Sequence, residues 1–425
     1  MTNRFRALAS ILAVLASTPA LGAGVHWIGT WSTAPQAAPP SSADEFRNQT
    51  VRLIAHVSVG GKKLRIRVSN TFGEQPLVIG RAHVARPATG AEIDPASDRL
   101  LKFGGNASIT IPARSEAVSD PVDLEIPALS DLAVSLYFPQ VAQATTSHVL
   151  ALQTNYVSSG IGDSTAAAKF PVEKTVSSWP FLTGVDVAAS GHGAAIVAFG
   201  SSLTDGDGST EDANRRWPDV LAERLQEASG SAAELGVLNE GIIGNRLLND
   251  SPPGPANPFG PMLGESGVKR FQRDVLAQSG IKFVLLCLGV NDILFPAFPF
   301  TPPTETVTAA NIIDGYRQLI ARAHAKGIRI IGTTIPPFEG AKFEAVGLNI
   351  DLYTPERDRA RIAVNEWIRR SGAFDGVVDF DRAVRDPDRP ARLLPAFAAE
   401  DGLHVNDAGN VAQANAISLT LFHLR

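Results

Sequence analysis

Four short polar stretches in the second half of the chain contain the residue types that nucleophilic catalysis needs. Three of them directly follow apolar runs that predict buried strands, and the fourth precedes the last predicted helix. Because the carboxyl ends of parallel strands open on one edge of a sheet, these stretches are expected to converge there although they lie far apart in sequence. They are Gly200-Ser201-Ser202-Leu203, Asn239-Glu240-Gly241-Ile242-Ile243-Gly244-Asn245, Gly289-Val290-Asn291-Asp292 and Asp401-Gly402-Leu403-His404.

Ser202, His404 and Asp401 have the types required for a nucleophile, its base and the group that orients the base. A serine hydroxyl is a weak nucleophile until a base accepts its proton. An imidazole can accept and return a proton near pH 7, and a carboxylate can hold its second nitrogen. The backbone N–H groups of Ser202 and Gly244 and the side-chain amide of Asn291 are candidate donors to the oxyanion of an acyl transfer.

Taken alone, each of these residues has an ordinary structural explanation. A serine after a strand commonly forms a turn, a glycine supplies a positive φ, and an asparagine caps a helix. The chain also contains seven histidines besides His404. The ordered occurrence of all four stretches is therefore the informative observation.

In this order the four stretches resemble the sequence blocks of the SGNH (GDSL) hydrolase superfamily, over about residues 195–422. The resemblance implies that Ser202, Asp401 and His404 form a catalytic triad and that Ser202, Gly244 and Asn291 form the oxyanion hole. It also implies a flavodoxin-like α/β/α sandwich that hydrolyses esters through an acyl-serine, without a metal or other cofactor. Ser201 stands where the family usually has Asp, which puts the usual hydrogen bonding of this turn in doubt.

The pattern of the chain predicts two domains after an N-terminal leader. Residues 24–190 contain short apolar runs of period two separated by turn signals, which predict an all-β sandwich or jelly-roll-like domain. Two such runs, 51–59 and 63–69, flank Gly60-Gly61 and predict a β-hairpin. From residue 191 to 425 strands alternate with helices, which predicts a largely parallel sheet. The region from Trp27 to Gly61 resembles the β-domain of a group of secreted bacterial superfamily members.

Residues 1–23 have the layout of a secretory signal peptide. Arg4 and Arg6 precede an apolar run at residues 7–16, and small residues surround the expected cleavage point near Gly22 or Ala23. We therefore expect a secreted or periplasmic protein. No later run is long and apolar enough for stable membrane insertion.

Charge and cysteine content narrow the possible partners. The formal net charge is −5, and no Lys/Arg stripe is present, so nucleic acid is not an expected partner. The single cysteine, Cys287, cannot pair within the chain and is expected to be a buried strand residue. No zinc-spaced His/Cys cluster occurs.

Several segments near these stretches have two interpretations. The Pro-rich segments 249–264 and 295–300 either wall the substrate pocket or form surface connections. Asp205-Gly206-Asp207-Gly208-Ser209 resembles a calcium loop, but it lacks the glycine and glutamate of an EF-hand, so a solvated turn is favoured. The alternation of residues 62–67 favours the solvent face of a strand over a functional basic patch.

These observations predict a secreted serine esterase. Its predicted substrates are small-molecule or polysaccharide esters, with acetyl or other small acyl groups on polysaccharide preferred. The alternatives are a broad-specificity carboxylesterase or lysophospholipase-like enzyme, or a glycan-binding protein whose hydrolase domain is degraded. The sequence does not predict an oligomeric state.

Overall fold

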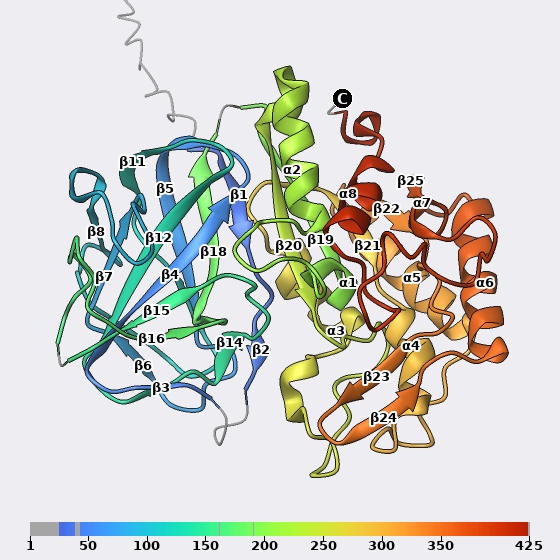
Figure 1. The fold of residues 1–425 in the computed structure, drawn as a ribbon. Helices are drawn as coiled ribbons and strands as arrows, with labels where there is room; N and C mark the ends of the chain where they lie inside the picture. Colours follow the sequence, from blue (N-terminus) through green and yellow to red (C-terminus); the bar gives the residue numbers. More distant parts are fainter. Residues whose placement is uncertain (1–24, 39–42, 161, 190, 424–425) are drawn as a thin grey trace, which may run out of the picture.

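Antiparallel strands form the first part of the chain in the computed structural model, which describes residues 25–38, 43–160, 162–189 and 191–423 (Figure 1). A six-stranded sheet has the order β16 (Val172–Val176), β15 (Asn155–Ser158), β4 (Gln49–Val57), β12 (Ser130–Phe138), β7 (Arg81–Ala85) and β8 (Arg99–Leu101). A five-stranded sheet contains β1 (Trp27–Ser32), β18 (Leu182–Ala188), β5 (Gly61–Ser69), β10 (Glu116–Val118) and β11 (Val122–Ile126). The smaller sheets pair β3 (Glu45–Phe46) with β13 (Ala142–Gln143), β6 (Leu77–Ile79) with β9 (Ile109–Ile111), and β14 (Thr146–His148) with both β2 (Gln36–Ala37) and β17 (Trp179–Pro180).

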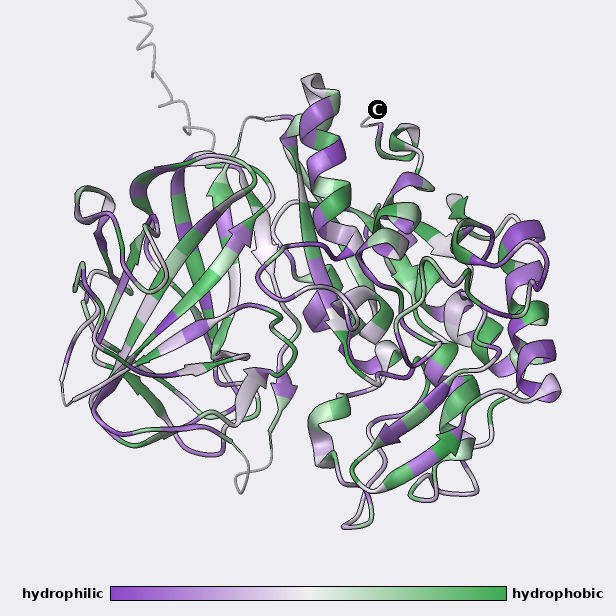
Figure 2. Cartoon of the chain, in the orientation of Figure 1, coloured by the Kyte–Doolittle hydropathy of each residue, from purple (hydrophilic) through white to green (hydrophobic). Residues whose placement is uncertain are grey.

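Side chains from both large sheets form one shared apolar core. Along β5, Leu64, Ile66 and Val68 are buried in it, while the intervening residues are more exposed. Figure 2 shows this alternation of hydrophobic and hydrophilic residues along the strands. The mostly antiparallel β architecture expected from the sequence is therefore confirmed.

The predicted hairpin around Gly60-Gly61 is wrong. β4 pairs with β12 and β15 in the six-stranded sheet, whereas β5 pairs with β18, β10 and β11 in the five-stranded sheet. The connection crosses from one sheet to the other, and Gly60 packs so tightly there that a Cβ would lie 2.7 Å from the Ala128 nitrogen. Local pattern identifies the strands, but pairing depends on which sheet buries each apolar face.

A parallel five-stranded sheet organises the second part of the chain. Its order is β20 (Leu235–Ile242), β19 (Ala194–Ser201), β21 (Ile281–Cys287), β22 (Arg329–Thr333) and β25 (Gly376–Val378). Alternate residues of β19 enter different cores. Val197 and Phe199 pack in one core, and Ile196 and Ala198 pack in the other. Helices therefore cover both faces, and the expected α/β/α layering is confirmed (Figure 1).

Helices alternate with the strands of this sheet, as predicted. α2 (Trp217–Ala228) and α8 (Asp407–Asn415) cover one face, and α5 (Ala309–His324) and α6 (Pro355–Arg370) cover the other. Between β20 and β21, α3 (Gly267–Phe271) is followed by a π-helical turn, Gln272–Leu276. The shorter helices are α1 (Ser202–Asp205), α4 (Val290–Leu294), α7 (Phe380–Val384) and the 3₁₀ turns Pro95–Ser97, Gly230–Glu234, Gly260–Leu263, Phe295–Ala297 and Leu419–Phe422. Among the described helices, none has the length and apolar character to cross a membrane.

A β-hairpin formed by β23 (Lys342–Ala345) and β24 (Leu348–Asp351) was not expected from the sequence. The register puts apolar residues on one face of the hairpin and polar residues on the other. The apolar face consists of Phe343, Ala345, Leu348 and Ile350. The hairpin brings Phe343 against Phe298, with ring centroids 5.2 Å apart.

The two parts of the chain dock through glycines. β1 lies beside β20, and a Cβ on Gly236 would lie 2.0 Å from the Gly29 carbonyl oxygen. Arg65 and Arg67 of β5 also take part, because Arg65 Nη2 donates to Ser279 Oγ at 3.3 Å and Arg67 Nη1 donates to Gln278 Oε1 at 2.9 Å. The solvent-facing interpretation of residues 62–67 is thus wrong for these two arginines, which form part of the domain interface.

Candidate active site

The structure brings Ser202, His404 and Asp401 into one hydrogen-bonded chain. Ser202 begins α1 at the carboxyl end of β19, and the other two residues lie in the loop before α8. His404 Nε2 lies 2.8 Å from Ser202 Oγ, and His404 Nδ1 lies 2.5 Å from Asp401 Oδ2. These contacts suit a serine that donates to one ring nitrogen and a carboxylate that accepts from the other.

The electrostatics of this chain favour a histidine that can gain a proton. Burial alone lowers the pKa of His404, but its hydrogen bond to Asp401 and the charges of Asp207 and Asp401 raise it above its ordinary value. Burial alone raises the pKa of Asp401, but the hydrogen bond and charge of His404 and two backbone N–H groups lower it to about 2. Those N–H groups belong to Leu403 and His404, each 2.9 Å from Asp401 Oδ1. Asp401 is therefore ionised at neutral pH and holds the ring in place.

The predicted oxyanion donors line the same cleft as the triad. Gly244, with φ of 68°, and Asn291 both border the cleft that contains Ser202. Asn291 Nδ2 donates to the Asn245 carbonyl at 3.0 Å, which orients the amide and leaves its second hydrogen for another acceptor. A Cβ on Gly244 would lie 2.7 Å from Leu263 Cδ2, so this turn requires glycine.

Asp292 connects the Asn291 turn to the chain that follows Gly244. Its carboxylate accepts the backbone N–H groups of Leu247 at 2.6 Å and Leu248 at 3.0 Å. Burial raises the pKa of Asp292 to about 6 although these hydrogen bonds favour the charged form. No role was predicted for Asp292, although its position directly after Asn291 indicates a residue of the same site.

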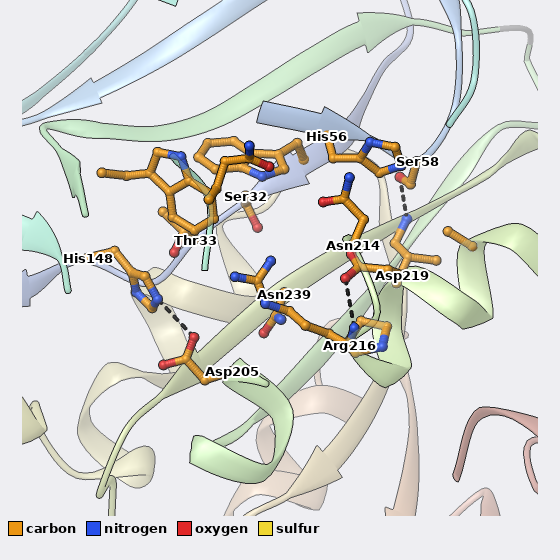
Figure 3. A pocket seen from close by; sticks show the side chains of 16 residues that line it. Ser32, Thr33, His56, Ser58, His148, Asp205, Asn214, Arg216, Asp219 and Asn239 are labelled. Atoms are coloured by element: carbon orange, nitrogen blue, oxygen red, sulfur yellow. Dashed lines mark hydrogen bonds and ion pairs between the residues drawn. The ribbon is translucent and has the colours of Figure 1, made fainter. Parts of the chain in front are cut away.

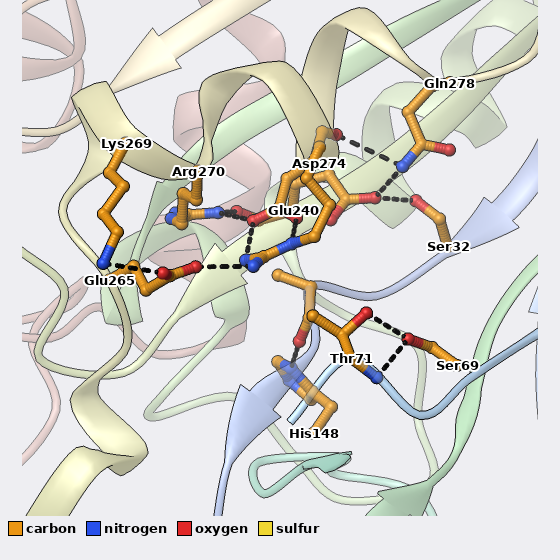
Figure 4. A network of polar contacts seen from close by, with 12 residues as sticks. Ser32, Ser69, Thr71, His148, Glu240, Glu265, Lys269, Arg270, Asp274 and Gln278 are labelled. Carbon is orange, nitrogen blue, oxygen red and sulfur yellow. Dashed lines mark hydrogen bonds and ion pairs between the residues drawn. The ribbon is translucent and has the colours of Figure 1, made fainter. Parts of the chain in front are cut away.

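A fully buried arginine, Arg270 of α3, contacts the carboxyl ends of β19 and β20 (Figure 4). Its guanidinium donates to the Gly200 carbonyl at 2.8 Å, to the Glu240 carbonyl at 2.9 Å and to Asn245 Oδ1 at 3.0 Å. Asp274 Oδ2, 3.0 Å from Arg270 Nη1, balances the charge. Sequence reasoning missed Arg270, because nothing in a helical segment distinguishes an inward-facing arginine from a solvated one.

Glu240 links this arginine network to the β-domain (Figure 4). Its Oε1 accepts hydrogen bonds from Ser32 Oγ at 2.5 Å and from Gln278 Nε2 at 2.9 Å. Burial, followed by the charge of Asp274, raises the pKa of Glu240 well above its ordinary value. Glu240 lies in the polar stretch at residues 239–245, but nothing in its local sequence indicates that it contacts the β-domain.

Ser201, which replaces the aspartate usual in the family, is fully buried. Its Oγ has no hydrogen-bond partner among the described residues. The turn is held by other groups, among them the Arg270 bond to the Gly200 carbonyl. The turn is therefore stabilised by contacts with other parts of the fold and does not need the hydrogen bonds of an aspartate at position 201.

Replacing Ser201 with alanine is expected to leave the free energy of unfolding unchanged or to raise it by about 1 kcal/mol, because a buried hydroxyl without a partner costs desolvation energy. Urea denaturation followed by circular dichroism measures this difference. A loss of more than about 1 kcal/mol would show that the hydroxyl contributes a stabilising hydrogen bond.

The segment 205–209 is not the fully solvated turn that was favoured. Asp205 is buried, with Oδ1 2.9 Å from His148 Nε2 and Oδ2 accepting the Ile243 N–H at 3.0 Å. Asp207 is partly exposed and lies 3.7 Å from His404 Nε2. Among the described residues, no group of three or more His, Cys, Asp or Glu side chains is placed to hold a metal ion.

Both Pro-rich segments wall the cleft, as one of their two interpretations predicted. The empty space of the cleft, including solvent at its mouth, is about 950 Å³. Apart from Ser202, Asp207, Gly244, Asn291 and His404, its lining is apolar. The apolar lining residues are Val149, Leu150, Ile243, Phe259, Met262, Leu263, Leu294, Phe295, Phe298, Phe300, Phe343, Leu352 and Leu403.

Solved structures that are similar to part of this chain include three esterases. An aryl esterase from M. smegmatis is 18% identical, with 52% of this chain and 95% of that chain covered and a TM-score of 0.38. A carbohydrate acetylesterase family member from Sinorhizobium meliloti is also 18% identical, with 52% and 94% covered and a TM-score of 0.37. A catalytic mutant of an acetylxylan esterase from Geobacillus stearothermophilus is 20% identical, with 54% and 93% covered and a TM-score of 0.37.

Comparison with curated proteins found no match. The model of the GDSL-like lipase/acylhydrolase family matches residues 196–417, which is more than half of the chain. The match spans Ser202, Gly244, Asn291, Asp401 and His404. The chain therefore belongs to the GDSL-like lipase/acylhydrolase family and carries an ester-hydrolase domain.

Proposed function

We propose that the chain is an exported serine esterase that prefers esters with an apolar acyl group. The observation that carries the proposal is the Ser202–His404–Asp401 chain of hydrogen bonds at the base of a cleft lined by phenylalanines. Export rests on the layout of residues 1–23, which lie outside the described residues.

The first half of the reaction forms an acyl-enzyme. Ser202 Oγ attacks the ester carbonyl carbon while its proton passes to His404 Nε2. The carbonyl oxygen becomes an oxyanion that accepts hydrogen bonds from the Ser202 and Gly244 N–H groups and the Asn291 amide. When the tetrahedral intermediate collapses, the C–O bond to the alcohol breaks, and His404 returns its proton to the leaving alkoxide.

The second half repeats these steps with water. His404 accepts a proton from the water that attacks the acyl carbonyl, and the same donors hold the second oxyanion. The bond to Ser202 Oγ then breaks, and His404 returns the proton to the serine as the carboxylic acid leaves. Asp401 remains ionised throughout and stabilises the imidazolium.

The lining of the cleft supports an apolar acyl group. Phe298 lies at the centre of an aromatic cluster, with ring centroids 5.3 Å from Phe295, 5.2 Å from Phe300 and 5.2 Å from Phe343. Phe259 adds edge contacts to Phe300 and Phe343. Each methylene that such a surface removes from water contributes about 0.8 kcal/mol.

Deacetylation of polysaccharide, the preferred substrate in the sequence analysis, is the second candidate. An acetyl group offers only one methyl to this apolar surface and needs little of the available space. The alternative of a carboxylesterase or lysophospholipase-like enzyme fits the lining better. A glycan-binding protein with a degraded hydrolase domain is disfavoured by the intact hydrogen bonds of the triad.

For p-nitrophenyl esters, we expect kcat/KM to rise by about fourfold for each added methylene from acetate to hexanoate, because each one is buried in the cleft. Phe343→Ala, which removes part of the wall, should reduce this increment and leave the rate with acetate within about threefold of wild type. Initial rates at substrate concentrations below KM measure both quantities.

Acetylated xylan is the matched substrate for the second candidate. Faster release of acetate from xylan than of hexanoate from its p-nitrophenyl ester, together with no gain from added methylenes, would contradict the apolar-acyl proposal. Ser202→Ala is the control that subtracts uncatalysed hydrolysis in every assay.

A further inference from the structure

A histidine of the β-domain reaches the back of the turn that carries Ser202. His148, the last residue of β14, has Nε2 2.9 Å from Asp205 Oδ1 and Nδ1 2.9 Å from the Ala34 carbonyl oxygen (Figure 3). The side chains of His148 and Asp205 are only 2% and 3% exposed. The contact is a buried one that joins the two domains.

Each ring nitrogen of His148 has its own partner. A carbonyl oxygen only accepts, so the hydrogen bond to Ala34 is donated by His148 Nδ1. The other ring nitrogen, Nε2, shares a hydrogen bond with the carboxyl group of Asp205. The ring is therefore held between a residue of the β-domain and a residue of the hydrolase domain.

Asp205 transmits this contact to two parts of the catalytic cleft. It is the last residue of α1, which begins at Ser202, and the Gly206 and Asp207 N–H groups after it donate to the Ser202 carbonyl at 2.9 and 3.1 Å. Its second oxygen accepts the N–H of Ile243, the residue before Gly244. One carboxylate thus sets the spacing between the nucleophile turn and the oxyanion loop.

The chain around His148 also forms part of the cleft. Val149 and Leu150, which directly follow it, line the space that contains Ser202. Gln36 of β2 holds this segment by accepting the Val149 N–H at 2.9 Å, and its Nε2 donates to the Met262 carbonyl in the Pro-rich wall at 2.5 Å. The β-domain therefore contacts the nucleophile turn and one wall of the cleft.

The docking around this contact is reinforced from the hydrolase side. Arg216, which precedes α2, donates to the Ala151 carbonyl and lies over the ring of Trp179, with Cζ 5.6 Å from the centroid. Its stem packs against Gly206, where a Cβ would lie 2.3 Å from Arg216 Cγ. His148, Asp205 and Arg216 line one pocket between the two domains (Figure 3).

We propose that His148 is a positioning residue for the ester hydrolysis proposed above: through Asp205, it holds the nucleophile turn and the oxyanion loop in their reactive spacing. The inference rests on the proposed function, and it makes the β-domain part of the hydrolytic machinery. A misplacement of about 1 Å by a residue outside the reacting groups can reduce the rate about 100-fold.

The test uses the full chain with His148→Ala and His148→Gln, assayed with p-nitrophenyl butyrate at least 10 °C below the Tm of each variant. We expect His148→Ala to lower kcat about 10- to 100-fold with KM changed less than threefold, and to slow fluorophosphonate labelling of Ser202 in parallel. His148→Gln, whose amide can donate a hydrogen bond to Asp205, should recover part of kcat.

His83→Ala is the matched control, because the buried His83 forms a similar pair with the partly buried Asp98, at 2.9 Å, within the β-domain. It should lower Tm but keep kcat within about twofold. Unchanged kcat and labelling in the His148 variants, or equal losses of kcat in the His148 and His83 variants, would overturn the proposal. A failure of the proposed function is a separate result, since wild type itself would then show no turnover that depends on Ser202.

Discussion

Ser202→Ala is expected to lower kcat for ester hydrolysis by about 10⁴- to 10⁶-fold and to abolish labelling by a fluorophosphonate probe. The methyl group cannot form the acyl bond, and His404 loses the hydroxyl 2.8 Å from its Nε2. The residual rate reflects the oxyanion donors and the cleft alone. Kinetics with p-nitrophenyl butyrate and labelling followed by gel fluorescence measure the two effects.

The fold of this variant should be intact. Ser202 is 4% exposed, and the change removes one oxygen atom without altering the backbone. Thermal unfolding checks this, and Ser201→Ala is the neighbouring control that should retain activity. If wild type and Ser202→Ala hydrolyse the ester equally fast, or take up equally little probe, Ser202 is not the nucleophile.

The second large effect is expected for Asp401→Asn, which should lower kcat/KM by about 10⁴-fold. The wild-type carboxylate accepts a hydrogen bond from His404 Nδ1–H. An amide can instead donate its own N–H to Nδ1, which favours the tautomer of His404 whose Nε2 carries the proton and cannot act as a base. Burial raises the pKa of Asp401, but His404 and two backbone N–H groups outweigh this effect and lower the pKa to about 2. Asp401 is therefore charged throughout the pH range of the assay.

The pH profile identifies the role of Asp401. In wild type the acidic limb of kcat/KM should lie above pH 6.5, because the pKa of His404 is raised and its protonated form cannot act as a base. As pH falls through that pKa, activity is lost. In Asp401→Asn the limb should move to lower pH, since the main hydrogen bond that raises the pKa is weakened.

A rate measurement from pH 5 to 9 on both proteins makes the comparison. Asp375→Asn is a suitable control, because Asp375 pairs with His324 at 2.9 Å on the surface, away from the triad. An unchanged acidic limb in Asp401→Asn, or a loss of kcat/KM below about tenfold, would contradict the assigned role.

The residues proposed for catalysis could be predicted from the sequence because the proposed chemistry depends on local features of the chain. A nucleophile at a strand end needs a sharp turn, and each oxyanion donor or base follows its own strand or precedes its own helix. Ser202, Gly244, Asn291, Asp401 and His404 therefore stand in short stretches whose order survives in the sequence. The layer architecture was predictable for a similar reason, since strands buried on both faces read as continuous apolar runs.

The supporting residues were not predictable, because their roles depend on contacts between distant segments. Arg65 reads as a solvated strand residue until the hydrolase domain covers it, and Asp205 reads as a turn residue until His148 reaches it. The hairpin of β23 and β24 has an alternating apolar face, but only the fold decides that Phe343 lies in the cleft. Neither Arg65 nor Asp205 has a local pattern that distinguishes it from ordinary surface.

By itself the sequence determined the residue types of the triad, the α/β character of the second domain and the β character of the first, because apolar periodicity and strand-end turns are local properties of a chain. Only the tertiary structure decided that β4 and β5 lie in different sheets, that five phenylalanines converge on the cleft and that His148 contacts Asp205. These outcomes depend on which segments bury their surfaces against each other. The free energy gained from that burial depends on both segments of a pair, so neither segment reveals it alone.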